Sequence, residues 1–155
     1  MKNILMLFIL LAAVAAGNAQ GVQSPAGKWK LREGWENTPA NKKIDFLRDM
    51  YKKQPCLEKL VYVFTISGGT ISLEENHCDD VDDDATPAFG TRWFIGGDPE
   101  NPSSPKTFIV VYNDEMDRQF FEIEKKGNKM MWRAVFKDPE TNQVERTIHY
   151  VFEKA

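Results

Sequence analysis

Histidine and cysteine are scarce in this chain, whose 155 residues include two of each. Nucleophilic catalysis needs a base within hydrogen-bond reach of the nucleophile and a third group that orients this base. His77 adjoins Cys78 at the end of an expected strand, and His149 alternates with apolar neighbours, so we expect it to point outward. No Gly-x-Ser-x-Gly, His-Glu-x-x-His or phosphate-binding glycine loop is present. The sequence therefore predicts that the protein is not an enzyme and uses no cofactor.

Basic residues are not in excess, because 20 lysines and arginines stand against 23 aspartates and glutamates, a net charge of −3. Proteins that bind nucleic acid concentrate positive charge on a stripe, and no such stripe appears. The aspartates within residues 79–84 match the first half of a calcium-binding loop, but Ala85 replaces the required glycine and Thr91 the required glutamate. The sequence thus predicts no nucleic-acid partner, and residues 79–84 are expected to form a solvated loop without a metal.

Long apolar runs are missing except near the start, where residues 4–16 form a run of 13. This run is shorter than the roughly 20 residues of a membrane-spanning helix, which argues against the alternative of an uncleaved anchor. Lys2 precedes the run, and Gly17 and Ala19 place small residues at the −3 and −1 positions of a cleavage site. We therefore expect a signal peptide over residues 1–19, cleaved after Ala19, and a secreted or periplasmic protein. Residues 20–155 are expected to form one domain with a single core and no membrane span.

In an exported protein, the pair of cysteines at Cys56 and Cys78 most simply forms a disulfide. Such a bridge would close a loop of about 22 residues and stabilise the fold by roughly 3 kcal/mol in the chain-entropy model. Across a turn centred near Gly68 the two cysteines are close to opposite but slightly out of register, so pairing needs a bulge or a departure from strand geometry near Pro55. The alternative is two unpaired thiols. A zinc site is disfavoured, because His77 is the only further nitrogen or sulfur ligand nearby.

Alternation of apolar and polar residues predicts a series of strands separated by turn residues. Ser67-Gly68-Gly69 and Gly127-Asn128 are typical of tight hairpin turns. The expected strands cover residues 27–35, 57–66, 70–77, 89–95, 106–113, 117–125, 129–137 and 143–153. Eight consecutive strands with mostly short connections predict an all-β fold, an eight-stranded antiparallel up-and-down barrel.

Between the first two strands the apolar period changes from two to about 3.6. Ile44, Leu47 and Tyr51 lie at i, i+3 and i+7, which predicts an amphipathic helix within residues 37–54. Pro39 and Pro55 fit the start and end signals of this helix. In a small barrel it would lie across one mouth.

An eight-stranded barrel is close to the size at which side chains alone fill the interior, so a ligand cavity and a packed core are both open. Tyrosines favour a cavity, because a buried hydroxyl needs a partner that a ligand or water can supply. We expect a small hydrophobic or amphipathic ligand inside the barrel, bound by Tyr62, Phe64, Trp93, Tyr112 and Trp132. The other residues expected to face inward are Trp29, Leu31, Ile71, Leu73, Val110, Phe121, Phe136, Ile148, Tyr150 and Phe152. The alternative is a protein-interaction or inhibitor module with a filled barrel, acting through loops such as residues 79–84 and 96–105.

The opening Gly27-Lys28-Trp29 resembles the Gly-x-Trp signature of lipocalins. The pattern is similar to that of secreted bacterial lipocalin-like proteins, with Cys56 before the second strand, an aromatic strand ending at Gly68-Gly69, and Cys78 after the third strand. The resemblance implies a lipocalin-like barrel of the calycin superfamily, with Gly27 and Trp29 in structural roles. It also implies that a basic residue of the last strand, here Arg146, covers Trp29 in a cation–π contact. At the place of the second lipocalin motif, this chain has Lys126-Gly127-Asn128.

Overall fold

The computed structural model describes residues 24–40, 42–67, 69–74, 90–113 and 118–155. The strands are β1 (Gly27–Asn37), β2 (Lys43–Ile44), β3 (Tyr62–Thr65), β4 (Thr70–Leu73), β5 (Arg92–Gly96), β6 (Phe108–Tyr112), β7 (Arg118–Lys126), β8 (Lys129–Lys137) and β9 (Val144–Lys154). The helices are α2 (Phe46–Lys53) and the 3-10 turn η1 (Pro55–Lys59). None of the helices in these ranges has the length and apolar character that crossing a membrane requires.

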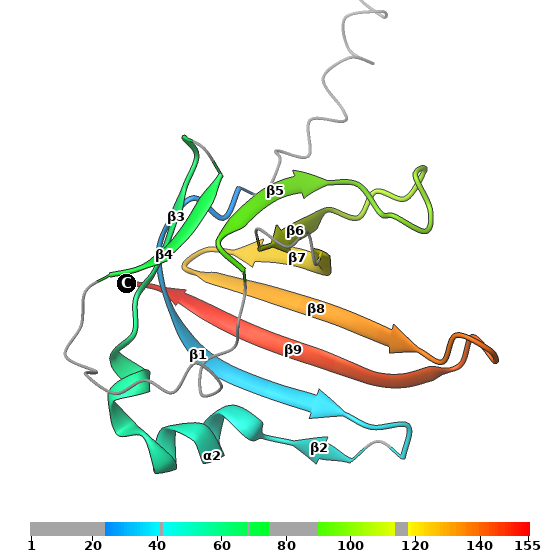
Figure 1. The fold of residues 1–155 in the computed structure, drawn as a ribbon, viewed down its shortest axis with the longest axis horizontal. Helices are drawn as coiled ribbons and strands as arrows, with labels where there is room; N and C mark the ends of the chain where they lie inside the picture. Colours follow the sequence, from blue (N-terminus) through cyan, green and yellow to red (C-terminus); the bar gives the residue numbers. More distant parts are fainter. Residues whose placement is uncertain (1–23, 41, 68, 75–89, 114–117) are drawn as a thin grey trace, which may run out of the picture.

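All strands belong to one antiparallel sheet that closes on itself when β1 pairs with β9 (Figure 1). The ring consists of β1 and β3 to β9, and the short β2 pairs only with the far end of β1. The long strands β7, β8, β9 and β1 lie side by side and make up one wall of the barrel. The predicted eight-stranded antiparallel barrel is therefore confirmed, with one short helical segment between its first two strands.

The predicted helix begins later than its apolar period suggested. The first strand, predicted to end at residue 35, continues to Asn37, and there β1 pairs with β2. Ile44, expected on the apolar stripe, lies in β2 and is 40% exposed. The helix starts after Asp45, whose side chain accepts a hydrogen bond from the backbone of Arg48 at 3.0 Å. This N-cap fixes the start of α2, because it satisfies one of the donors at the end of the helix.

Helix α2 packs against the inner side of β1 and β9. Gly34, which pairs with Tyr150, permits this approach, because a Cβ atom there would lie 2.9 Å from the ring of Phe46. The Phe46 ring meets the Tyr150 ring edge-on at 5.7 Å between centroids. The hydroxyl of Tyr51 donates a 2.7 Å hydrogen bond to the carbonyl of Leu31. The helix is thus held by ring packing and by one bond to the wall of the barrel.

The second strand of the barrel also starts later than predicted. The chain forms η1 after α2, and β3 begins at Tyr62 rather than at residue 57. Leu57 lies in this helical turn and is buried. Its apolar character therefore reflects the packing of the turn and not the alternation of a strand. Cys56 also lies in η1, where the backbone departs from strand geometry. Cys78 lies outside the described residues, so the disulfide stays a prediction, as do the structures of residues 1–19 and 79–84.

Aromatic side chains fill the middle of the barrel. The rings of Phe64, Trp132 and Phe152 contact one another, with centroids 5.6, 6.4 and 4.8 Å apart. Phe121 lies 5.3 Å from the Trp132 ring, and Trp93 lies 6.3 Å from Phe64. All five side chains are buried. Tilted and edge-on contacts at these distances are the favoured arrangement of aromatic pairs, so the rings form a packed core.

The N-terminal segment and β7 cover Trp29. Gly27 has a φ of 127°, a backbone conformation that favours glycine. The indole nitrogen of Trp29 donates to the carbonyl of Pro25 at 2.6 Å. Lys125 places its ammonium 5.4 Å from the centre of the Trp29 ring and donates to the carbonyl of Ser24 at 3.3 Å. A basic residue therefore covers this tryptophan, and it comes from β7.

The expectation that Arg146 covers Trp29 is wrong. Because β1 and β9 are antiparallel, Trp29 at the start of β1 pairs with Lys154 at the end of β9. Arg146 lies eight residues before Lys154, which is roughly 25 Å along an extended strand. Its guanidinium lies 4.6 Å over the ring of Phe136 and 3.8 Å from the carboxylate of Glu36. Arg146 therefore belongs to the opposite end of the barrel.

Candidate functional site on the outer face of strands β6 to β9

Four of the five residues expected to bind a ligand lie in the packed core. Tyr62, Phe64, Trp93 and Trp132 are all buried there and contact other aromatic rings. Tyr112, the fifth, lies on the outer face, where its ring meets that of the half-exposed Phe94. The structure therefore brings four of these residues together and separates Tyr112 from them.

The error at Tyr112 has a local cause. All five residues of β6 are apolar or aromatic, so no polar residue marks which side of this strand faces outward. Ile109 and Val111 face inward and are fully buried, opposite to the predicted alternation. Val110 faces outward but is still buried, because Phe94 and Phe120 flank it on the two neighbouring strands.

The indole nitrogen of Trp93 and the hydroxyl of Tyr51 have hydrogen-bond partners in the protein. The indole nitrogen of Trp93 donates to the carbonyl of Thr70 at 3.1 Å, as the Tyr51 hydroxyl does to a carbonyl of β1. Burial raises the pKa of Tyr150 to about 12, and that of Tyr62 higher still. These phenols are thus neutral across the physiological range. A ligand is not required to satisfy Trp93 or Tyr51.

A row of directly paired residues crosses the outer face of five strands. In order it contains Phe108 on β6, Glu122 on β7, Arg133 on β8, His149 on β9 and Trp35 on β1. Such cross-strand neighbours lie close enough for their side chains to interact. The Trp35 and His149 rings stack at 4.8 Å with an angle of 5° between their planes. The row therefore joins an aromatic end to a charged centre.

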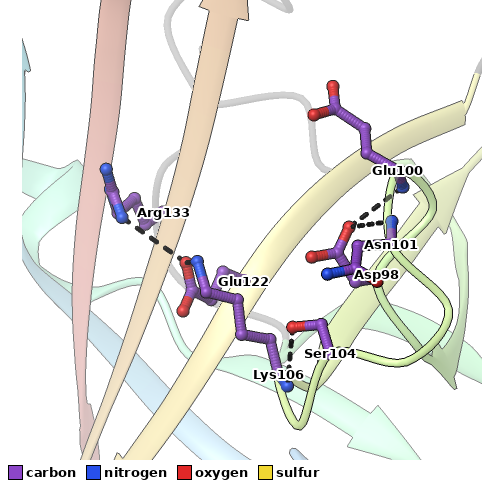
Figure 2. Close-up of polar contacts among 7 residues, drawn as sticks. All are labelled: Asp98, Glu100, Asn101, Ser104, Lys106, Glu122 and Arg133. Carbon is purple, nitrogen blue, oxygen red and sulfur yellow. Dashed lines mark hydrogen bonds and ion pairs between the residues drawn. The ribbon is translucent and has the colours of Figure 1, made fainter.

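Glu122 is the centre of the charged part, as Figure 2 shows. Its carboxylate oxygen lies 3.1 Å from the ammonium of Lys106 and 3.5 Å from the guanidinium of Arg133. The shorter contact makes Lys106 the nearer partner. Arg133 contributes one nitrogen to this contact and has further donors in its planar group.

Three hollows lie along this row, and together they form what we call the outer groove. The loop hollow, of about 390 Å³, lies between residues 97–107 and strands β6 to β8. The central hollow, of about 280 Å³, lies between Trp35 and Glu122. The end pocket, of about 530 Å³, lies beside the β1–β2 turn and is lined by Asn37, Thr38, Pro39, Arg133, Val144, Thr147 and His149. Arg133 lines all three, so the hollows adjoin one another.

The loop of residues 97–107 is tied to the sheet at two points. Glu100 pairs with Lys137 of β8 at 2.6 Å, and Lys106 pairs with Glu122 of β7. The side chain of Asp98 accepts hydrogen bonds from the backbone of Glu100 at 2.9 Å and of Asn101 at 3.2 Å, which folds the loop into a turn (Figure 2). The loop thus forms one wall of the loop hollow.

The floor of the loop hollow is apolar and accessible. Phe120 and Val135 line it, and each is 39% exposed on the outer side of the barrel. Exposed apolar side chains that gather in a patch commonly mark an interaction surface. The sequence carries a signal for these two exposed residues. Because Phe120-Phe121 and Val135-Phe136 are adjacent apolar pairs in strands, one member of each must face outward.

Electrostatics and burial both act on His149. Partial burial lowers its pKa, and the positive charges of Arg133 and Lys43 lower it further. The imidazole is therefore neutral at pH 7. Lys43 also lies 4.3 Å from the centre of the Trp35 ring, and the amide of Asn37 lies 3.4 Å from Nε2 of His149. Among the described residues, no group of three or more histidine, cysteine, aspartate or glutamate side chains is placed to hold a metal ion.

Comparison of the chain with protein-family models, with curated proteins and with solved structures gives no match. The lipocalin-like resemblance therefore rests on the sequence motifs and stays a prediction.

Proposed function

We propose that this protein is an exported binding module, without enzymatic activity, that recognises a polypeptide partner through the outer groove. The observation that carries the proposal is the contrast between the two sides of the sheet. The inner side is packed with buried aromatic rings such as Phe64 and Trp132, whereas the outer side exposes Phe120 and Val135 in a hollow with a charged rim. An apolar floor with a few polar groups around it is typical of binding sites.

The form of the groove favours a polypeptide over a single small molecule. Three adjoining hollows extend across the outer face from residues 97–107 to the β1–β2 turn. A sugar polymer would stack on an exposed aromatic ring. The Trp35 ring is instead contacted by side chains from both flanking strands, the imidazole of His149 on β9 and the ammonium of Lys43 on β2. An extended chain with apolar side chains on either side of a charged residue fits the apolar loop hollow and the charged centre at Glu122 and Arg133.

Selection from a displayed peptide library tests the proposal, with two matched variants as probes. Phe120→Ser removes an apolar residue that lines the loop hollow. Phe94→Ser removes a residue of the same outer face with a similar exposure, 42% against 39%, that does not line the hollow. We expect Phe120→Ser to weaken the selected peptides at least about tenfold, as loss of an interface anchor does, and Phe94→Ser to leave binding within about twofold.

Circular dichroism of both variants confirms that the barrel is intact before binding is compared. Equal weakening by both substitutions would contradict recognition in the loop hollow. Native mass spectrometry of the purified protein tests the rival, a small molecule inside the barrel. A fatty acid, retinoid or pigment that stays bound to the wild type and is lost in Trp93→Ala would overturn the proposal.

A further inference from the structure

The end pocket differs in charge from the rest of the outer groove. Among the residues that the structure describes, its lining contains Arg133, His149 and the neutral polar residues Asn37, Thr38 and Thr147, but no aspartate or glutamate. The loop hollow, by contrast, is lined by Asp98, Glu100 and Glu122 as well as by basic residues. The charged residue in the described lining of the end pocket is therefore basic, whereas the lining of the loop hollow carries charges of both signs.

We propose that the end pocket binds a carboxylate group, with the guanidinium of Arg133 as its ion-pair partner and Asn37 and Thr147 as neutral donors. The planar fork of an arginine matches the two oxygens of a carboxylate. A single guanidinium beside a neutral imidazole also matches one negative charge rather than two. The inference goes beyond the proposed function, because a free carboxylic acid would bind in the same way as the carboxylate of a peptide.

The surroundings of Arg133 permit this role. Arg133 pairs with Glu122 at 3.5 Å, and that carboxylate lies nearer to Lys106, at 3.1 Å. About half of the Arg133 side chain is exposed, so a ligand can reach it without unfolding the sheet. Because Arg133 pairs directly with His149 across β8 and β9, a ligand held by the guanidinium lies next to the imidazole.

This adjacency makes His149 a reporter of binding. The charged groups around it are Arg133 on β8, Lys43 on β2, and Glu122 and Glu124 on β7, which share the central hollow with it. The two cations lower the pKa of His149, and an anion bound at Arg133 would oppose them. A carboxylate in the pocket therefore raises the pKa of His149, and by reciprocity it binds more tightly when the imidazole is protonated.

The experiment is a pH titration of the His149 ring by NMR, in sodium acetate and in sodium chloride of equal ionic strength. The His149 signal is identified by its loss in His149→Gln. We expect acetate to raise the pKa of His149 by about 0.5 to 1 unit relative to chloride, which corresponds to a roughly three- to tenfold preference for the protonated form. Equal pKa values in the two salts would overturn the proposal.

Two substitutions that each remove one arginine locate the effect. Arg133→Gln should abolish the difference between acetate and chloride, although it also raises the pKa of His149 in chloride by removing a nearby cation. Arg118→Gln is the matched control, because Arg118 is exposed on β7 and does not line the end pocket. It should keep the full acetate effect. Retention of the effect in Arg133→Gln would contradict the assignment of the ion pair.

The identity of the anion and the role of Glu122 give two further arms. Inorganic phosphate at the same ionic strength should raise the pKa of His149 less than acetate does; a larger rise would replace the carboxylate site by one for dianions.

Glu122→Gln removes the carboxylate that competes for Arg133, so the apparent affinity for acetate should increase several-fold. A loss of affinity in Glu122→Gln would contradict this competition. None of these arms uses Phe120, so failure here leaves the peptide-binding proposal to its own test.

Discussion

Truncation of Phe64 tests whether the barrel is filled. Phe64 is 2% exposed, and its ring contacts those of Trp93, Trp132 and Phe152. Replacing a buried phenylalanine by alanine removes the transfer free energy of the ring and leaves a cavity, at a cost of about 3–5 kcal/mol. Because three aromatic neighbours surround this ring, we expect Phe64→Ala to lower the free energy of unfolding by about 4 kcal/mol, near the middle of that range.

Urea denaturation measures this loss, and in a thermal scan it corresponds to a fall in Tm of roughly 10–20 °C. Phe94→Ala is the control, because it removes the same ring from the outer face, where the side chain is 42% exposed. This control should cost no more than about 1 kcal/mol. A cost below about 1.5 kcal/mol for Phe64→Ala would refute a packed interior, because a ring that borders a solvent-filled or ligand-filled space has less to lose. Benzene should raise the Tm of Phe64→Ala more than that of the wild type, since the truncation leaves an apolar cavity in place of the ring.

Two further predictions concern the ends of the barrel and its outer face. Lys125→Ala should lower the free energy of unfolding in urea by about 1 kcal/mol, because it removes the cation over Trp29 and a hydrogen bond. Arg146→Ala should stay within about 0.5 kcal/mol. A larger cost for Arg146→Ala than for Lys125→Ala would contradict the role of Lys125 as the residue that covers Trp29. Since the folded state lowers the pKa of His149, its contribution to stability is complete above the unfolded pKa of about 6.5 and is lost as the pH falls through the folded pKa. Thermal scans from about pH 7.5 to about pH 5 should therefore show a smaller loss of Tm in His149→Gln than in the wild type, and an equal loss would contradict the lowered pKa.

Local patterns were sufficient for the number of strands in the barrel and for the fold class. Residues 129–137 are mostly apolar and lie between the turn residues Gly127-Asn128 and Asp138-Pro139, and β8 has these same bounds. Gly27 was identified from a motif, and its positive φ supplies the reason why glycine stands there. The number of strands and their short connections then left an up-and-down barrel as the simplest closure. These features depend on neighbours in the sequence, so one sequence is enough to predict them.

Pairing between distant segments decided the rest. The exchange of Lys125 for Arg146 over Trp29 follows from the register of β1 against β9, which no local pattern encodes. In the same way the uniformly apolar β6 could face either way, and closure of the sheet placed Tyr112 outside. The outer groove has no sequence motif, because its central row takes one residue from each of five strands. Sequence periodicity reports which residues share a side of a strand, but only the tertiary structure decides which side is inside and which residues of separate strands meet.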